Sequence, residues 1–226
     1  MLRAVIFDFD GVITDSEVLH LRSFNEVLAH YGIEIATKDY YKDYLGLNDV
    51  DLLNVLVEKG FLKLDGDQIK NLVEQKKQIY ERLAKTDGCI IEGVRHFLEM
   101  LEHNNILMAI CSGSLLAEIE LILEQAHLRH FFEVIVSAEQ LKKGKPNPDG
   151  FLLTLQRLNE RSEEPVLANQ CVVIEDSHWG LEAANAAGMH TVAITNSYDA
   201  EELALAEKII TRLSDLSINE LQELCS

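Results

Sequence analysis

Ala-Val-Ile-Phe-Asp-Phe-Asp-Gly-Val-Ile-Thr-Asp, residues 4–15, is the most informative segment of the chain. Its apolar, β-branched start, Ala4 to Phe7, is typical of a buried strand. The strand is followed by two acids, Asp8 and Asp10, and then by Gly11, which lets the chain turn. Carboxylates at positions i and i+2 of an extended segment point to the same side, and their charges repel unless a cation lies between them. The segment therefore predicts a Mg²⁺ site with a reactive carboxylate at the end of a parallel strand.

Composition limits the classes of function. The 226 residues are 47% hydrophobic, enough for one elaborated domain or two small ones. A net charge of −18, which we attribute mainly to solubility, disfavours nucleic acid and anionic membranes as partners. The four cysteines form no Cys-x-x-Cys or Cys/His cluster, so neither disulfides nor zinc are indicated. Without a leader or a membrane-spanning apolar run, we expect a soluble, cytoplasmic monomer.

From about residue 93 onward, strand-like and helix-like segments alternate. The strand-like runs are continuously apolar, which is typical of a parallel sheet covered on both faces. Together with the first strand they predict an α/β core, a Rossmann-like doubly wound parallel sheet. The expected strands are 106–111, 133–136, 171–175, 190–194 and 208–210, and the expected helices are 115–125, 149–158 and 178–187.

Residues 16–88 follow a different pattern, with no convincing strand. Their apolar residues recur at helical spacing, which predicts a bundle of about four helices inserted as a cap after the first strand. We expect the cap domain at 16–88 and the catalytic core at 1–15 and 89–226, with hinges at 14–16 and 86–88. The first helical series consists of Val18, Leu21, Phe24, Leu28 and Tyr31.

Polar groups follow four of the predicted strands. Asp8 and Asp10 follow the first, Ser112-Gly113-Ser114 the second, Lys145 the third and Glu175-Asp176 the fourth. Ligands of open α/β sheets bind at the carboxyl ends of the strands. The sequence therefore predicts that these groups converge on one edge of the sheet.

Each of these groups also has a structural interpretation. Ser112 can bind a phosphate oxygen, with Gly113 allowing close backbone approach, but taken alone it is better explained as a helix N-cap. Lys145 lies in a proline-rich loop, where it could pair with a phosphate and with Asp8, or it could be an exposed lysine. Glu175-Asp176 could add carboxylates to the metal site or simply start a helix, and the two interpretations are compatible.

Two cap residues are further candidates for substrate contact. His20 lies on the first cap helix and could face Asp10 across a cleft, although lone helix histidines are more often structural. Lys76, on a later cap helix, is the weaker candidate of the two. His178 and Trp179 follow the second acidic pair and are better explained by packing than by lining a pocket.

The residues at the sheet edge would support nucleophilic phosphoryl transfer. Asp8 would attack phosphorus and form an aspartyl phosphate. Asp10 would protonate the leaving alcohol and then deprotonate the attacking water. Mg²⁺, Lys145 and the Ser112 loop would neutralise charge on the phosphoryl oxygens, and the helical bundle would close as a lid.

These four motifs, in this order, resemble those of the haloacid dehalogenase superfamily, and the match spans nearly the whole chain. The helical insert is similar to the small cap of the β-phosphoglucomutase and phosphoglycolate phosphatase branch. The resemblance implies that Mg²⁺ is bound by Asp8, the main-chain carbonyl of Asp10, and Asp176, with Glu175 close by or coordinating. The presence of Asp10 argues against dehalogenase and phosphonate-cleaving activities, whose family members typically lack this aspartate.

The resemblance leaves two activities open, a phosphatase and a phosphomutase. His20, Gly46 and the Lys76…Tyr80 spacing are similar to β-phosphoglucomutase. That mutase has an arginine shortly after the glycine, which grips a second phosphate. This chain has Leu47-Asn48-Asp49 there, and its acid would repel a phosphate. We therefore favour a phosphatase of small phosphomonoesters, of sugar phosphate or phosphoglycolate type, with a β-phosphoglucomutase-like mutase as the alternative.

Three other classes fit less well. Signalling receiver domains also combine an aspartyl phosphate, Mg²⁺, a Ser or Thr and a lysine, but they are much shorter and lack a cap. A metabolite-binding protein without catalysis would not need Asp10 beside Asp8. A dinucleotide-binding enzyme is disfavoured because no Gly-x-Gly-x-x-Gly follows the first strand. The expected partner is thus a small phosphorylated metabolite.

Overall fold

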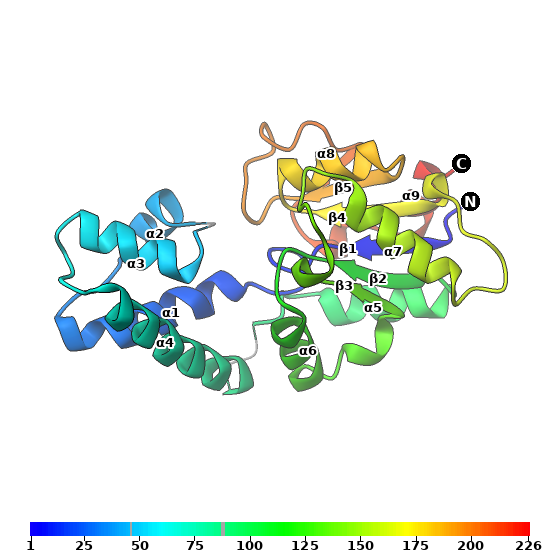
Figure 1. The fold of residues 1–226 in the computed structure, drawn as a ribbon. Coiled ribbons are helices and arrows are strands. Elements are labelled where there is room, and N and C mark those ends of the chain that lie inside the picture. Colours follow the sequence, from blue (N-terminus) through cyan, green and yellow to red (C-terminus); the bar gives the residue numbers. More distant parts are fainter. Residues whose placement is uncertain (46, 87–88) are drawn as a thin grey trace. The chain divides into compact units, whose positions relative to one another are not determined.

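The computed structural model describes residues 1–45, 47–86 and 89–226 (Figure 1). The chain divides into two compact units, a core of Met1–Asp15 with Ile90–Ser226, and a cap of Ser16–Cys89. The second boundary expected from the sequence lies one residue earlier, after residue 88. Gly46, and residues 87 and 88 of the expected second hinge, lie outside the described residues. The predicted fold class, a Rossmann-like α/β core with an inserted helical cap, is confirmed.

The core contains a six-stranded parallel sheet in the order β3-β2-β1-β4-β5-β6, of which Figure 1 labels β1 to β5. The central strand is β1, in which Ile6 is aligned with Ala109 on one side and Val173 on the other. All four residues of β1 are buried, as its continuous apolar run predicts. The strands are β1 (Ala4–Phe7), β2 (Leu107–Cys111), β3 (Val134–Val136), β4 (Cys171–Glu175), β5 (His190–Ile194) and β6 (Lys208–Ile210).

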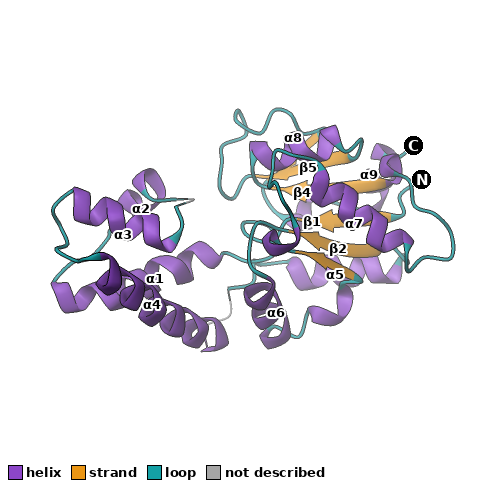
Figure 2. Cartoon of the chain, in the orientation of Figure 1, coloured by secondary structure: helices purple, strands orange, loops and turns teal. Residues whose placement is uncertain are grey.

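Helices cover both faces of this sheet (Figure 2). On one face, Ile6 belongs to an apolar cluster with Phe151 and Ala184. On the other face, the Phe7 ring meets the Phe97 ring edge-on, with centroids 6.1 Å apart. Each core segment predicted from the sequence is correct to within one residue at either end, whereas α5 and α9 were not predicted. The core helices are α5 (Val94–His103), α6 (Leu116–Gln125), α7 (Asp149–Asn159), α8 (His178–Ala186) and α9 (Ile218–Leu224).

The cap contains four α-helices in its described residues and an apolar core of its own. Leu21, Phe24 and Leu28 are buried in it, as the helical spacing predicts. Val18 and Tyr31 of the same series are exposed instead, at 42% and 47%. Tyr31 leaves the series because the helix ends at Leu28 and a 3₁₀ turn follows. The helices are α1 (Ser16–Leu28), α2 (Thr37–Asp43), α3 (Asp49–Glu58) and α4 (Gly66–Thr86).

Short 3₁₀ turns complete the secondary structure of the described residues, at Ala29–Tyr31, Arg129–Phe131, Ala138–Gln140, Ala168–Gln170 and Leu213–Asp215. Throughout the described part of the chain, no helix has the length and apolar character needed to cross a membrane.

Candidate active site

The parallel topology gathers the predicted polar groups at the carboxyl ends of neighbouring strands. Asp8 directly follows β1, and its amide donates to the Ile174 carbonyl of β4 at 2.9 Å. Ser112 follows β2, and its amide donates to the Val136 carbonyl at the end of β3, also at 2.9 Å. Both motifs are thus tied by main-chain hydrogen bonds to the adjacent strand. Their positions are fixed by the sheet itself.

Lys145 is the cation of this cluster. Its ammonium group donates to the carboxylates of both Asp8 and Glu175. Burial lowers the pKa of Lys145, but the two carboxylates outweigh it, so the pKa lies well above its ordinary value. The lysine is therefore permanently charged and is not an exposed loop residue. Its loop leads directly into α7, where the Asn147 side chain accepts a hydrogen bond from the Asp149 amide at 2.9 Å.

Glu175 is completely buried, and both of its carboxylate oxygens have protein donors. Oε1 accepts from Lys145. Oε2 accepts from the amides of Asp176 and Ser177, both at 3.0 Å, and from the Ser177 hydroxyl at 2.9 Å. A Cβ on Gly180 would lie 1.8 Å from Oε1, so the first turn of α8 has room only for glycine there. This geometry favours a role for Glu175 in positioning Lys145. It disfavours direct coordination of a metal by Glu175.

Burial first, and neighbouring carboxylates second, disfavour the charged form of the two remaining buried acids, Asp8 and Asp176. Burial raises the pKa of Asp8 well above its ordinary value, with Lys145 opposing and neighbouring carboxylates adding to the rise. Burial, followed by the charge of Glu175, raises the pKa of Asp176 to about 7, and Asp10 contributes to both shifts. Several carboxylates thus share one ammonium group, which is the electrostatics expected of a site that binds a cation.

The set of oxygen donors suits a hard divalent cation. Mg²⁺ requires only one or two carboxylates, because water, substrate or main-chain oxygens supply its other ligands. Asp8, Asp10 and Asp176 offer such a set. Among the described residues, no group of three or more Asp, Glu, His and Cys side chains is placed so that it could hold a metal ion by itself. The residues present therefore fit an open Mg²⁺ site better than a structural one.

Asp10 and the serine loop lie beside this cluster. Asp10 accepts a hydrogen bond from the Ser114 hydroxyl. The Ser112 hydroxyl is buried and accepts from the Ser114 amide at 3.0 Å, which shapes the turn through Gly113. Ser112 is not the N-cap of α6, since that position is Leu115 and carries no side-chain cap. The loop thus orients Asp10 by a direct hydrogen bond, a contact that the sequence did not reveal.

His20 and Lys76 belong to the cap, where they contact each other. Lys76 is only 2% exposed, and its Nζ lies 2.6 Å from His20 Nδ1 and 2.8 Å from an Asp49 oxygen. Burial and the Lys76 charge lower the pKa of His20 to about 3, so its ring is neutral and Nδ1 accepts the hydrogen bond. The rings of Phe24 and Tyr80 flank the ammonium group, with centroids 4.8 and 5.3 Å away.

Asp49 is the member of this cap cluster that sequence reasoning missed as a partner of Lys76. The available signal was Lys76 itself, a cation placed at helical spacing between Leu72 and Tyr80, both of which are buried. A lysine on an apolar face requires a buried or half-buried acid. Which acid supplies that partner depends on how α3 packs on α4 and cannot be derived from local spacing.

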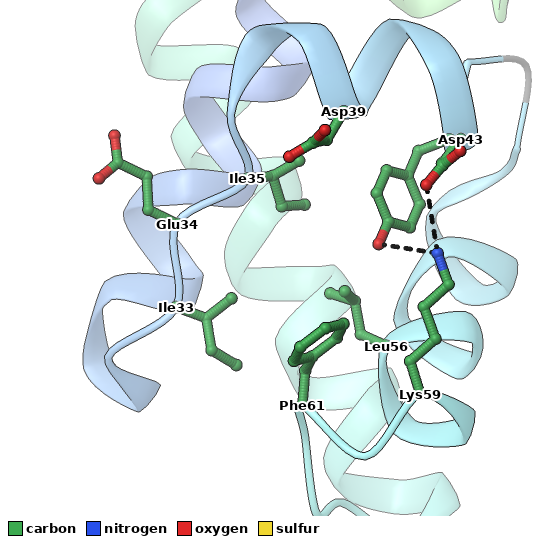
Figure 3. A pocket seen from close by; sticks show the side chains of 9 residues that line it. Ile33, Glu34, Ile35, Asp39, Asp43, Leu56, Lys59 and Phe61 are labelled. Atoms are coloured by element: carbon green, nitrogen blue, oxygen red, sulfur yellow. Dashed lines mark hydrogen bonds and ion pairs between the residues drawn. The ribbon is translucent and has the colours of Figure 1, made fainter.

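The cap also contains a separate hollow of about 350 Å³ (Figure 3). Apolar side chains that include Ile35 and Phe61 line it, together with several acids. Lys59, a cation in its wall, is held by the Asp43 carboxylate at 3.5 Å and the Tyr44 hydroxyl at 3.4 Å. None of the predicted site residues lines this hollow.

His178 and Trp179, at the start of α8, form an aromatic cluster with Tyr198. The ring centroids of His178 and Trp179 are 4.0 Å apart, and the Tyr198 ring meets that of His178 edge-on at 5.4 Å. This agrees with the packing interpretation of His178. Trp179 remains 47% exposed.

Comparisons with known proteins agree with this geometry. Residues 5–194 match the haloacid dehalogenase-like hydrolase family. The chain is 34% identical, over 84% of each sequence, to the phosphorylated carbohydrates phosphatase of Thermotoga maritima. It is 32% identical to the fructose-1-phosphate phosphatase of Escherichia coli, over 84% of this chain and 95% of that protein.

Structure comparison gives the same assignment. The crystal structure of β-phosphoglucomutase from Clostridium difficile superposes with a TM-score of 0.76 at 28% identity, covering 100% of this chain and 97% of that one. Sequence motifs, sheet topology and relatives thus agree, and the chain belongs to the haloacid dehalogenase-like hydrolase family as a hydrolase of phosphoric monoesters.

Proposed function

We propose that this enzyme is a Mg²⁺-dependent phosphatase that hydrolyses small sugar phosphates through an aspartyl-phosphate intermediate on Asp8. The observation that carries the proposal is the Lys145 bridge between Asp8 and Glu175 at the carboxyl end of the central strand. The bridge fixes the orientation of the Asp8 carboxylate, and Asp10 and Asp176 lie near enough to raise the pKa of Asp8. A nucleophile, an acid/base and a cation site are thereby combined.

Asp8, Asp176 and the main-chain carbonyl of Asp10 would hold the Mg²⁺. When bound, the cation supplies positive charge that draws the substrate phosphate to Asp8 and neutralises its oxygens. Lys145 also supplies positive charge to the phosphate oxygens, because it remains an ammonium group. The Ser112 loop would offer further hydrogen-bond donors to the phosphoryl oxygens, as the family resemblance implies.

In the first half of the reaction, an Asp8 oxygen attacks phosphorus and the P–O bond to the leaving alcohol breaks. Asp10 gives its proton to that oxygen. In the second half, Asp10 takes a proton from water, which attacks phosphorus and releases inorganic phosphate with a free Asp8 carboxylate. The hydrogen bond from Ser114 holds Asp10 in place for both transfers.

A phosphatase is favoured over a mutase by the cap cluster. A mutase must hold a second phosphate, which requires a cation whose charge is not already neutralised. In the described part of the cap, the buried ammonium group of Lys76 is paired with Asp49 at 2.8 Å. We propose that Lys76, His20 and Asp49 contact the sugar part of the substrate by hydrogen bonds. The phosphatase relatives act, by their names, on phosphorylated carbohydrates and fructose 1-phosphate, which supports this substrate class.

The experiment that tests this function is Mg²⁺-dependent phosphate release from a panel of sugar phosphates that includes fructose 1-phosphate and β-glucose 1-phosphate. Glucose 6-phosphate is measured in the same tubes, and Asp8→Asn serves as the control. We expect free phosphate from some substrates and none with the variant. Glucose 6-phosphate formed with little free phosphate would establish the mutase, which the likeness to β-phosphoglucomutase keeps as the second candidate.

A further inference from the structure

Three consecutive side chains in the connection between β5 and β6, which we call the clamp, contact Asp176 and the segments beside it. They are Asn196, Ser197 and Tyr198. The start of this connection is anchored to the sheet, because the Thr195 amide donates to the Ile210 carbonyl at 3.0 Å. Asn196 and Ser197 are exposed residues that gain little from burial. Their hydrogen bonds nevertheless reach parts of the chain that are distant in sequence.

Ser197 contacts the carboxylate that we assign to the metal. Its hydroxyl donates to Asp176 Oδ2. This oxygen also packs on Gly11, where φ is +77° and a Cβ would lie 1.8 Å from Oδ2 and 3.0 Å from the Ser197 oxygen. The hydroxyl, the carboxylate and the Gly11 backbone therefore form one tightly packed stack. Rotation of the carboxylate would disrupt the two contacts that Oδ2 makes, with the Ser197 hydroxyl and with Gly11.

The other two clamp residues fix the elements on either side of Asp176. The Asn196 side chain donates to the Gly11 carbonyl at 2.7 Å, which ties the clamp to the loop after Asp8. The Tyr198 ring packs edge-on against His178 and Trp179, with the latter centroid 6.1 Å away. The clamp thus connects the loop that carries the nucleophile to the start of α8.

We propose that Ser197 is a positioning residue for Mg²⁺ binding, which acts by holding one oxygen of Asp176 so that the other faces the cation. This proposal rests on the proposed Mg²⁺-dependent function. A hydroxyl can donate only one hydrogen bond, so it fixes one carboxylate oxygen and leaves the second unblocked. Mutation of a partner that orients a metal-binding residue typically weakens metal affinity by about 10- to 100-fold.

The test measures metal affinity without turnover. Mn²⁺ is titrated into the substrate-free protein and free Mn²⁺ is counted by electron paramagnetic resonance, with Mg²⁺ then added as a competitor. Wild type is compared with Ser197→Ala, with Ser197→Thr, which retains the hydroxyl, and with Asp176→Asn. Ser162→Ala is the matched control, because that hydroxyl also donates a hydrogen bond in the core unit, to the nearby Glu164 carbonyl. Steady-state kinetics on the best sugar phosphate is measured at several Mg²⁺ concentrations.

We expect Ser197→Ala to bind Mn²⁺ and Mg²⁺ about tenfold more weakly. Its kcat should return towards the wild-type value at saturating Mg²⁺, while KM for the sugar phosphate stays unchanged. Ser197→Thr should restore the affinity, and Ser162→Ala should match wild type.

Wild-type metal affinity in Ser197→Ala, combined with loss of affinity in Asp176→Asn, would overturn the positioning role and leave the proposed function standing. A kcat in Ser197→Ala that stays low at saturating Mg²⁺ would also overturn it. Wild-type turnover that needs no divalent cation would instead overturn the Mg²⁺-dependent function and this inference with it. The two failures are therefore distinguishable.

Discussion

The core and the cap each hold a lysine against carboxylates, Lys145 in the core and Lys76 in the cap, and the two lysines differ in how their charge is balanced. In the core, Lys145 donates to both Asp8 and Glu175, and further acids lie close enough to raise the pKa of Asp8. In the cap, Lys76 has one acid, Asp49, and one neutral ring, His20. The core cluster keeps an excess of negative charge, whereas the cap cluster is balanced.

This difference separates two tasks. A cluster with excess carboxylate can recruit a cation and, through it, a phosphate. A balanced cluster offers donors and acceptors that suit the hydroxyl groups of a sugar and gives little electrostatic attraction to a second phosphate. The comparison predicts that changes in the core act on chemistry with every substrate, while changes in the cap act on the choice of substrate.

The largest expected effect comes from removing each lysine in turn. Lys145→Met should lower kcat by about 10²- to 10³-fold on every substrate, since a preorganised positive charge at the phosphoryl group is lost. Lys76→Met should lower kcat/KM by about tenfold, and unequally among substrates, because only a hydrogen bond to the sugar is lost. Both values come from steady-state kinetics at saturating Mg²⁺.

Circular dichroism and thermal melts must show that both lysine variants are folded, because each leaves a carboxylate without its partner. Equal losses on all substrates from the two variants would contradict the division of tasks between core and cap.

The second prediction concerns crowding around Glu175. Gly180→Ala would place a methyl group 1.8 Å from Glu175 Oε1 and should cost about 1–3 kcal/mol of unfolding free energy, with reduced kcat as Lys145 shifts. Gly113→Ala, in the serine loop, is the matched control. Its methyl group would meet nothing within 4 Å, so the expected change is below about 0.5 kcal/mol. Urea unfolding of both variants provides the measurement, and similar stability losses would refute the crowding argument.

The third prediction is that the two clusters respond to pH with opposite sign in metal-free protein. His20 has a folded pKa of about 3 and an ordinary value of 6.5. Between these values the unfolded chain binds the extra proton, so acidification from pH 7 to pH 5 should remove about 2 kcal/mol of stability. Asp176 has a folded pKa of about 7 against an ordinary 3.8, so the folded chain binds the extra proton there and acidification stabilises the core.

Single substitutions separate the two contributions. Stability is measured by urea unfolding with a chelator present. His20→Asn keeps a hydrogen-bond acceptor for Lys76 but has no titratable ring, so the loss of stability caused by acidification through His20 should disappear. In Asp176→Asn, the gain of stability caused by acidification through Asp176 should disappear. The assignment of the shifts would be wrong if neither substitution changed the pH dependence between pH 5 and pH 7.

The smallest expected effect is a change in substrate preference. Asp49→Asn keeps a hydrogen-bond acceptor for Lys76 but removes the balancing charge. The ratio of kcat/KM for a sugar bisphosphate to that for the matching monophosphate should rise by several-fold, about the effect of one partly screened charge. An unchanged ratio would mean that the Lys76–Asp49 pair does not govern the selection of substrate charge.

Much of the core could be predicted from the sequence for a simple reason. Continuous apolar runs reveal strands that are buried on both faces, and the parallel topology then places Asp8, Ser112, Lys145 and Asp176 at one edge without further information. The order of motifs along the chain is enough for that step. Two amphipathic core helices, α5 and α9, were missed, but they do not alter the site.

The remaining contacts depend on tertiary packing. Ser197 lies in a connection whose sequence contains no motif, and only the path of the chain after β5 brings its hydroxyl to Asp176. Asp49 lies in the first turn of α3, and only the packing of α3 on α4 brings it to Lys76. The saturation of Glu175 by donors likewise follows from the tight first turn of α8 at Gly180. None of these three contacts can be derived from the spacing of residues along the sequence.

The most direct test of the central claim is to locate the phosphoryl group on the enzyme. In Asp10→Asn, p-nitrophenyl phosphate needs little acid assistance, so Asp8 should still be phosphorylated while hydrolysis of the intermediate is slowed. After acid quench and proteolysis, mass spectrometry should find the phosphoryl group on Asp8, and on no residue of the Asp8→Asn, Asp10→Asn double variant. Release of p-nitrophenolate with an unmodified Asp8, or a phosphoryl group on another residue, would contradict the account.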